Sequence, residues 1–225
     1  LLECDGGTVE SCVERLISSF RLNVKSVNGT EYLFIPTYYS AEEHIAARLT
    51  AVKKYIDRKV TVDKLEIENV ERKLGIVFED LQRQAIFEAF ESGILILTGG
   101  PGTGKTTTLN AIIKLFENRE LDIELAAPTG RAAKRMTELT GKEAKTIHRL
   151  LEVEWTNEDK PQFARNEKNP LSCEVIIIDE ASMIDAVLFD NLLKALRLSC
   201  RIILVGDSDQ LPSIGAGNVL NDILS

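Results

Sequence analysis

The amino-acid sequence predicts an α/β fold in which helices cover both faces of a parallel sheet. Four apolar runs, at residues 94–97, 123–127, 175–178 and 201–205, have the length and composition of strands buried on both faces. Each run is followed by a polar segment. In open α/β sheets such segments meet at the carboxyl edge of the strands, where ligands bind. We therefore expect the functional residues at that edge.

The first apolar run leads into a glycine-rich loop, Gly99-Gly100-Pro101-Gly102-Thr103-Gly104-Lys105-Thr106, with the spacing G-x-x-x-x-G-K-[ST]. Its glycines allow successive backbone N–H groups to point at a phosphate, and the predicted helix at 107–117 adds the positive end of its dipole. We expect Lys105 to contact the β- and γ-phosphates and the Thr106 hydroxyl to ligate Mg²⁺. The predicted nucleotide contacts in this loop are Gly100, Pro101, Gly102, Thr103, Gly104, Lys105, Thr106 and Thr107.

Composition limits the kind of protein. With 44% hydrophobic and 28% charged residues, the chain resembles ordinary globular proteins. Its net charge of −8 argues against a nucleic-acid surface that covers the whole chain. No apolar run approaches the roughly 20 residues that span a bilayer, and residues 1–5 lack the features of a signal peptide. We expect a cytoplasmic protein without a membrane partner.

The four cysteines, Cys4, Cys12, Cys173 and Cys200, form no C-x-x-C pair, and neither histidine lies near them in the sequence. In a cytoplasmic protein this spacing favours buried free thiols over a metal site or a disulfide framework.

The N-terminal third of the chain predicts a separate, mostly helical domain. Apolar residues at helical spacing are followed by a hairpin with an Asn28-Gly29 turn. A capping box at Ser40 predicts a long helix to about residue 57, and Gly75 ends a short helix at 63–74. We predict an accessory domain at 1–75 and an α/β domain at 76–225.

A helix with the predicted buried residues Leu81, Ala85, Ala89 and Phe90 precedes the glycine-rich loop. This pattern leaves Gln82 free to project from the helix. A glutamine amide is able to pair with adenine N6 and N7, but the residues alone indicate an exposed surface glutamine.

The segment 128–149 concentrates positive charge in an acidic chain, since it contains six basic residues and two acidic ones. Its cations and hydroxyls would suit the phosphates of a nucleic-acid strand, although a solvated helix face has the same composition. The following segment, 152–172, predicts a small hairpin insertion. Its Trp155 would either stack on a base or pack within the hairpin.

Two adjacent carboxylates, Asp179 and Glu180, follow the strand at 175–178. We expect Asp179 to hold the Mg²⁺ hydration shell and Glu180 to orient or deprotonate the attacking water. The strand at 201–205 leads to a polar loop in which Gln210 is the predicted γ-phosphate contact. Residues 215–218 then supply backbone amides at the start of the final helix.

The order of these motifs resembles the first motor domain of superfamily 1 DNA helicases, most closely the RecD-like branch. The resemblance implies a RecA-like fold of the P-loop NTPase class from Phe78 onward, and for residues 1–75 only an accessory domain. The segments that carry it are Gln82 with Ala85 and Ile86, GGPGTGKTT at 99–107, APTGRAAKRM at 127–136, TIHRLL at 146–151, IIIDEASMID at 176–185 and LVGDSDQLPSIGAGNVL at 204–220.

The resemblance implies that ATP hydrolysis drives movement along single-stranded DNA in the 5′ to 3′ direction. Gln82 becomes the adenine reader, and Gln210 senses the γ-phosphate and couples it to the DNA. Segment 152–172 lies where such helicases carry the hairpin that splits the duplex. The residues that match the DNA-contacting segments of the family are Pro128, Thr129, Gly130, Arg131, Thr146 and His148.

The resemblance also implies a second RecA-like domain, which supplies arginines that complete the ATP site and which this sequence lacks after Ser225. An arginine finger is worth about 10³ to 10⁵ in rate where one is used. We expect the chain to bind nucleotide, to hydrolyse it slowly and not to unwind DNA unaided. Nuclease or repair subunits are further candidate partners.

Two other hypotheses remain open. A different P-loop NTPase, such as a GTPase, would share the loop, although the sequence has no N-K-x-D guanine motif. A module that uses nucleotide only for assembly in a DNA-repair complex would need neither Glu180 nor Gln210.

Overall fold

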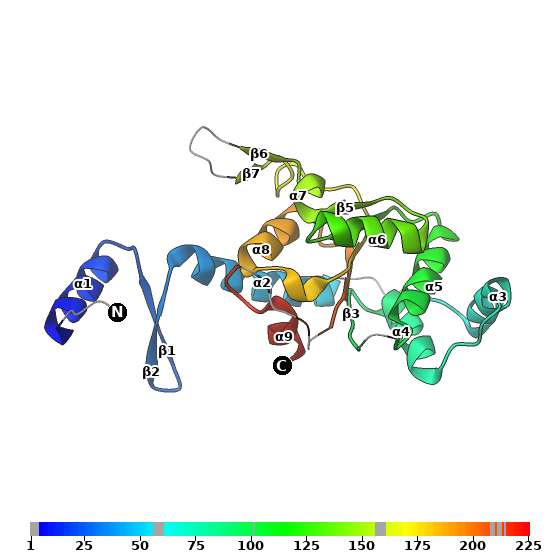
Figure 1. Cartoon of the computed structure of the whole chain (residues 1–225), viewed down its shortest axis with the longest axis horizontal. Coiled ribbons are helices and arrows are strands. Elements are labelled where there is room, and N and C mark those ends of the chain that lie inside the picture. Colours follow the sequence, from blue (N-terminus) through cyan, green and yellow to red (C-terminus); the bar gives the residue numbers. More distant parts are fainter. Residues whose placement is uncertain are drawn as a thin grey trace.

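The computed structural model describes residues 5–55, 61–100, 102–155, 161–207, 210, 213 and 215–225. Its centre is a five-stranded sheet in the order β3-β9-β8-β4-β5, and every neighbouring pair of strands is parallel (Figure 1). The sequence predicted four of these strands at the observed bounds. The five strands are β3 (Ile94–Leu97), β4 (Ile123–Ala127), β5 (Ala144–Thr146), β8 (Val175–Ile178) and β9 (Arg201–Val205).

The fifth strand, β5, has no apolar run to mark it. It is a three-residue edge strand whose residues are all half-buried. Its pairing with β4 places Thr146 opposite Ala127, so the loops that follow these two strands lie side by side at the carboxyl edge.

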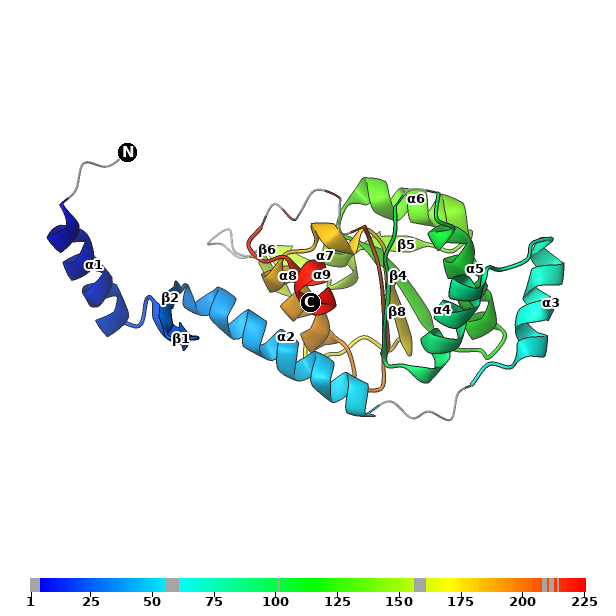
Figure 2. The same ribbon diagram turned by 90° about the horizontal axis from the view of Figure 1, so that it is seen from below.

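Helices cover both faces of the sheet, which confirms the predicted α/β class (Figure 2). One face of the sheet is covered by α2 (Pro36–Tyr55) and α8 (Ala186–Ala195) together with three shorter helices. The other face is covered by four helices, among them α5 (Lys105–Glu117), which follows the glycine-rich loop. The shorter helices of the first face are α7 (Ile147–Leu150), η1 (Ala181–Met183) and α9 (Val219–Leu224). The other helices of the second face are α3 (Lys64–Leu74), α4 (Asp80–Glu91) and α6 (Gly130–Thr140).

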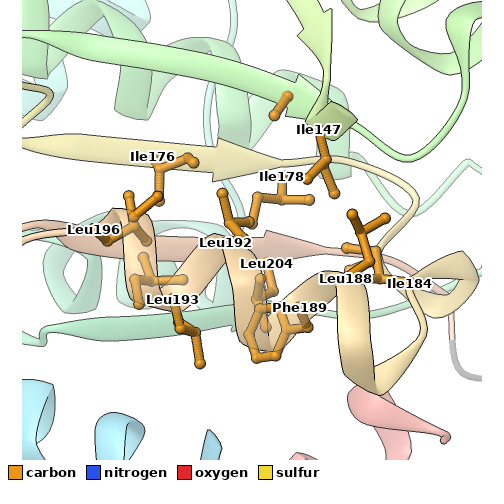
Figure 3. Packing of buried hydrophobic residues seen from close by; sticks show 14 of the residues in the cluster. Ile147, Ile176, Ile178, Ile184, Leu188, Phe189, Leu192, Leu193, Leu196 and Leu204 are labelled. Atoms are coloured by element: carbon orange, nitrogen blue, oxygen red, sulfur yellow. The ribbon is translucent and has the colours of Figure 1, made fainter. Parts of the chain in front are cut away.

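Successive side chains of β8 point to opposite faces of the sheet, so this strand contributes to the hydrophobic cores on both faces. Ile176 and Ile178 point into the cluster with α8, whereas Val175 and Ile177 point into the cluster with α4 and α5. Figure 3 shows Ile176 and Ile178 above the α8 side chains. All four residues of the strand are fully buried, so the strand is apolar throughout instead of alternating with polar residues.

Helix α2 begins at Pro36, so the predicted start at Ser40 was wrong. Proline favours the first turn of a helix, because its fixed φ suits that turn and its missing N–H has no intrahelical partner there. The helix crosses α8, and Ile45 and Val52 lie in the same hydrophobic cluster as Ile176. Residues 36–55 are therefore part of the core that covers one face of the sheet.

Helix α3 has the predicted limits. Asp63 caps its first turn, and Gly75 ends it in the left-handed conformation with φ 67°. It packs on α5, and Ile67 and Val70 join the cluster on the second face. The core is thus continuous across residue 75, and the division into domains at that point stays a prediction.

The segment before α2 projects away from the sheet (Figures 1 and 2). It consists of α1 (Gly6–Ser18) and a hairpin of β1 (Asn23–Val27) and β2 (Thr30–Phe34). Asn28 and Gly29 form its turn with φ of 51° and 81°, as the Asn-Gly pair predicted. None of the α1 residues, all of which the structure describes, is buried.

A second hairpin consists of β6 (Val153–Trp155) and β7 (Pro161–Phe163) and lies within the segment for which the sequence predicted one; that this segment is an insertion stays a prediction. Residues 156–160 and the side chain of Trp155, to which the stacking hypothesis refers, lie outside the described residues. Cys173 and Cys200 are buried free thiols as predicted, whereas Cys12 is exposed and Cys4 is outside the described part. Among the described residues no helix combines the length and apolar character needed to cross a membrane.

Candidate functional site

The glycine-rich loop connects β3 to α5 and is closed by its own side chains. Lys105 Nζ donates to the carbonyl oxygens of Gly99 and Gly100, the latter at 2.9 Å, and Thr103 Oγ1 donates to the Gly100 oxygen at 3.0 Å. Gly102 and Gly104 have φ of 81° and 83°, a region that favours glycine. The lysine therefore lies across the mouth of the loop. Pro101 lies outside the described residues.

The Gln82 side chain on α4 contacts the glycine-rich loop. The predicted set of buried residues on this helix was partly wrong. Leu81, predicted to be buried, is 78% exposed, and the buried side of α4 consists of Ile86, Ala89 and Phe90. The Gln82 Oε1 atom accepts from the Glu79 backbone N–H at 3.0 Å, while its Nε2 occupies the space where a Cβ of Gly104 would stand. The positive φ favours glycine at position 104, and a larger residue there would displace the end of the Gln82 side chain.

Asp179 and Glu180 lie where β8 ends. The Asp179 carboxylate accepts from the Glu180 N–H at 2.9 Å, and Glu180 adopts a left-handed conformation with φ 54°. Burial raises the pKa of Asp179, with nearby Arg135 and Lys105 acting in the opposite direction. Burial, followed by the charge of Asp179, likewise raises the pKa of Glu180. Two adjacent carboxylates with raised pKa values in one cavity are typical of a functional site.

A cavity of about 410 Å³ unites the predicted nucleotide motifs. Residues from the glycine-rich loop and α5, from the end of β8, and from the loop after β9 line it together. The predicted residues among them are Gly100, Gly102, Thr103, Gly104, Lys105, Thr106, Thr107, Asp179, Glu180 and Gln210. The carboxyl edge of the parallel sheet brings these segments together from positions more than 100 residues apart.

Two charged residues that line the cavity, Arg135 and Asp207, were not predicted as site residues. Arg135 on α6 has its guanidinium 3.7 Å from the Glu180 carboxylate. From the sequence, Arg135 was identified only as one of the basic residues of segment 128–149, since neither spacing nor charge indicates the direction of its side chain. Asp207 is buried two residues after the end of β9, and its charge raises the pKa of Glu180. The sequence could have indicated Asp207, because a carboxylate close behind an apolar strand is expected at the carboxyl edge of the sheet.

The oxygen donors of the cavity fit Mg²⁺. The Thr106 hydroxyl and the Asp179 carboxylate share the cavity, and Mg²⁺ prefers hard oxygen ligands. Within the described part of the chain no cluster of three His, Cys, Asp or Glu residues forms a metal site. This set suits an ion that takes one or two protein ligands and completes its coordination with phosphates and water.

The predicted DNA-contacting residues lie outside this cavity, on the neighbouring loops after β4 and β5. Thr129 and Thr146 cap α6 and α7, and their hydroxyls accept from the N–H groups of Ala132 and Arg149 at 3.2 Å. Pro128 is half-buried, and Gly130, Arg131 and His148 are exposed. The six residues lie on two neighbouring segments, after β4 and at the end of β5, and the His148 ring centroid lies 6.1 Å from that of Phe163 in the β6–β7 hairpin.

The loop after β9 also packs tightly on α8. A Cβ at Gly215 or Gly217 would overlap Asp185 or Ala186 at the start of that helix. Asn218 precedes α9, so the predicted start of the final helix is confirmed. Ser208, Asp209, Leu211 and Pro212 lie outside the described residues.

Comparison with known proteins agrees with this geometry. The model of a family described as AAA domain matches residues 82–216, more than half of the chain. The ATP-dependent RecD2 DNA helicase of Deinococcus radiodurans is 46% identical over 125 residues, which are 55% of this chain and 17% of that protein. The RecBCD enzyme subunit RecD of Mycobacterium tuberculosis is 38% identical over 217 residues, or 85% of this chain and 36% of that subunit.

The chain thus spans much less than two thirds of the length of either relative. Among solved structures, Bacteroides Pif1 bound to single-stranded DNA has a TM-score of 0.46 and 25% identity, covering 66% of this chain and 36% of that one. On the family match, the chain belongs to the family described as AAA domain, and its sequence is similar to those of RecD-like superfamily 1 helicases.

Proposed function

We propose that this chain is the first motor domain of an ATP-dependent DNA helicase that moves along single-stranded DNA from 5′ to 3′. The observation that supports this most is the cavity shared by the glycine-rich loop, the Asp179–Glu180 pair and Gln210. A site that only holds a nucleotide would need the loop alone. A carboxylate for the attacking water and an amide for the γ-phosphate are parts of a hydrolytic site.

The loop binds the triphosphate. Its N–H groups and the start of α5 attract the phosphates, and Lys105 exchanges its bonds to the Gly99 and Gly100 carbonyls for phosphate oxygens. Thr106 and Asp179 would hold Mg²⁺, which neutralises charge on the phosphates when it is bound. Gln82, which lies against Gly104, would read the adenine edge with its amide.

Glu180 orients the attacking water and accepts its proton. Burial and the charge of Asp179 raise its pKa, so the carboxylate is a stronger base than an exposed glutamate. Arg135 opposes this shift and favours the ionised form. Gln210 would contact the γ-phosphate from the loop after β9, and this loop also touches the start of α8.

The surface around Arg131 and His148 would hold the DNA strand. Two threonine-capped helix starts, an exposed arginine and backbone amides there suit phosphate contacts. A second RecA-like domain would complete both the ATP site and the DNA track. RecD of the RecBCD enzyme is by its name a subunit of a complex, and we extend to this chain a place beside nuclease or repair subunits.

Hydrolysis assays test the proposal. The chain joined to a second motor domain is expected to hydrolyse ATP in preference to GTP and to be stimulated by single-stranded DNA. The 225-residue chain is expected to bind ATP, to hydrolyse it slowly and not to unwind a duplex. Glu180→Gln is the matched control, because it keeps the volume and removes the base.

The outcomes separate the hypotheses. Absence of DNA stimulation, together with intact nucleotide binding, would contradict the motor and favour an assembly module. Multiple-turnover unwinding by the 225-residue chain would refute the requirement for a second domain.

A further inference from the structure

Glu71 is a buried carboxylate on α3, outside the region that the family model matches. Its side chain is 9% exposed, and its Oε1 atom accepts both from the Phe78 backbone N–H and from the Arg83 guanidinium, each at 2.8 Å. Arg83 Nε in turn donates to the Phe78 carbonyl at 3.2 Å. The three residues close a ring of charge-assisted hydrogen bonds between α3 and the first turn of α4.

This ring holds the residues that orient Gln82. Arg83 follows Gln82 directly, and the Arg83 N–H donates to the Glu79 carbonyl at 3.0 Å. The Glu79 N–H donates to Gln82 Oε1, so the amide plane depends on where the backbone of residues 78 and 79 lies. Gln82 Nε2 is thereby placed against Gly104 of the glycine-rich loop.

We propose that Glu71 is a positioning residue for adenine recognition: through Phe78 and Arg83 it fixes the start of α4 and thus the amide of Gln82. This inference rests on the proposed ATP site. Neither Glu71 nor Gln82 is among the residues that line the cavity, and the contacts of Glu71 lead to Gln82, so we expect an effect on recognition of the base and not of the phosphates.

The chemistry of the site explains why a carboxylate serves here. Burying a charge is costly unless it is paired and hydrogen-bonded, and an apolar side chain would pack at lower cost. An apolar side chain would, however, leave the Phe78 N–H and the Arg83 guanidinium without this acceptor. The Glu71 carboxylate accepts from the Phe78 backbone N–H, just before α4, and from the Arg83 side chain within α4. Together these two bonds fix the position and the rotation of the start of the helix.

A second contact of α3 supplies the control. Glu66 on the same helix pairs with Arg119 after α5, at 2.8 Å, and this pair touches neither Phe78 nor Gln82. Glu66→Ala removes this salt bridge, and the acceptor of the Asp63 N–H, in the first turn of α3, five residues before Glu71. It therefore loosens α3 without releasing the start of α4.

The experiment measures binding of ATP, GTP and inorganic tripolyphosphate to the 225-residue chain by displacement of a fluorescent ATP analogue. In Glu71→Gln and Glu71→Ala the preference for ATP over GTP is expected to fall, by about tenfold in the alanine variant if one good bidentate base contact is lost. Tripolyphosphate affinity is expected to stay within about twofold of the parent, since the phosphate loop is not involved. Glu66→Ala is expected to keep the ATP preference.

The results distinguish this inference from the proposed function. Unchanged ATP preference in both Glu71 variants would overturn the positioning role while leaving the ATP site intact. A parent chain that binds neither ATP nor tripolyphosphate would overturn the proposed site itself, and the inference with it. An equal loss of tripolyphosphate and ATP affinity in Glu71→Gln, which retains an acceptor for Phe78, would show a general structural role and would also overturn the inference.

Discussion

The guanidinium of Arg135 lies 3.7 Å from the carboxylate of Glu180 and joins α6 to the end of β8 across the cavity. This contact links the helix that starts in the basic segment to the predicted base. It also opposes burial and the charge of Asp179, both of which raise the pKa of Glu180.

Arg135→Ala is expected to shift the acid limb of ATP hydrolysis to higher pH. Glu180 acts as a base only when ionised, so activity falls as the pH drops through its pKa. Removing the arginine raises that pKa further, because Arg135 lowers it. The pH dependence of kcat, measured in the protein that includes a second motor domain, tests this. Lys134→Ala, the exposed neighbour on the same helix, is the control, and an unchanged limb in Arg135→Ala would refute the coupling.

Lys105→Ala is expected to weaken ATP binding by roughly 10- to 100-fold, the value of one or two hydrogen bonds to a charged group. The lysine already lies on the loop carbonyls, so the chain has no need to reorder to use it. Titration with a fluorescent ATP analogue measures the effect. Lys114→Ala removes the same charge from the last turn of α5 and should leave affinity unchanged.

Gly104→Ala is expected to weaken ATP binding by about tenfold without unfolding the chain. At φ 83° an alanine costs about 1 to 2 kcal/mol of strain, and its methyl group would also overlap Gln82 Nε2. Gly141→Ala is the matched control, because its φ of 72° brings similar strain but its Cβ would meet nothing within 4 Å. The midpoint temperature of thermal unfolding should fall by the same amount in both variants. Equal nucleotide affinity in both would contradict the role of the Gln82 contact.

Ile45→Ala is expected to lower the free energy of unfolding of the α/β core by about 2 to 5 kcal/mol. Ile45 is buried with residues of α8 and the sheet, so its removal opens a cavity in the shared core. Denaturant unfolding followed by circular dichroism measures the change. Val9→Ala on α1, which is 50% exposed, should change stability by less than about 0.5 kcal/mol. A small effect of Ile45→Ala would mean that α2 folds independently of the sheet.

Arg131→Ala is expected to weaken single-stranded DNA binding uniformly across sequences and to reduce the salt dependence of the affinity by about one contact. Arg131 is exposed at the start of α6, beside the loop after β5. Fluorescence anisotropy at several salt concentrations tests this. Lys53→Ala, an exposed cation near the end of α2, should leave the salt slope unchanged. A lower affinity with an unchanged slope would argue against a phosphate contact.

The sequence alone determined the elements whose signals are local. Strands buried on both faces are continuous apolar runs, so β3, β4, β8 and β9 were predicted at their observed bounds. Gly75 was identifiable as the end of α3, since helix termination depends on residues a few positions away. Lys105, Asp179 and Glu180 followed from motifs at strand ends, because parallel strands deliver their carboxyl ends to one edge.

Only the tertiary structure decided which side chains meet across elements. The side of α4 that is buried depends on α3 and α5, and for that reason Leu81 was wrongly predicted to be inside. Arg135 turned toward Glu180 because of how α6 packs beside the end of β8, and Glu71 turned toward Phe78 because of how α3 packs beside the start of α4. Neither periodicity nor charge contains that information. Short-range spacing determines which residues form a helix. Which side of that helix faces a neighbouring element is determined by packing in the folded chain.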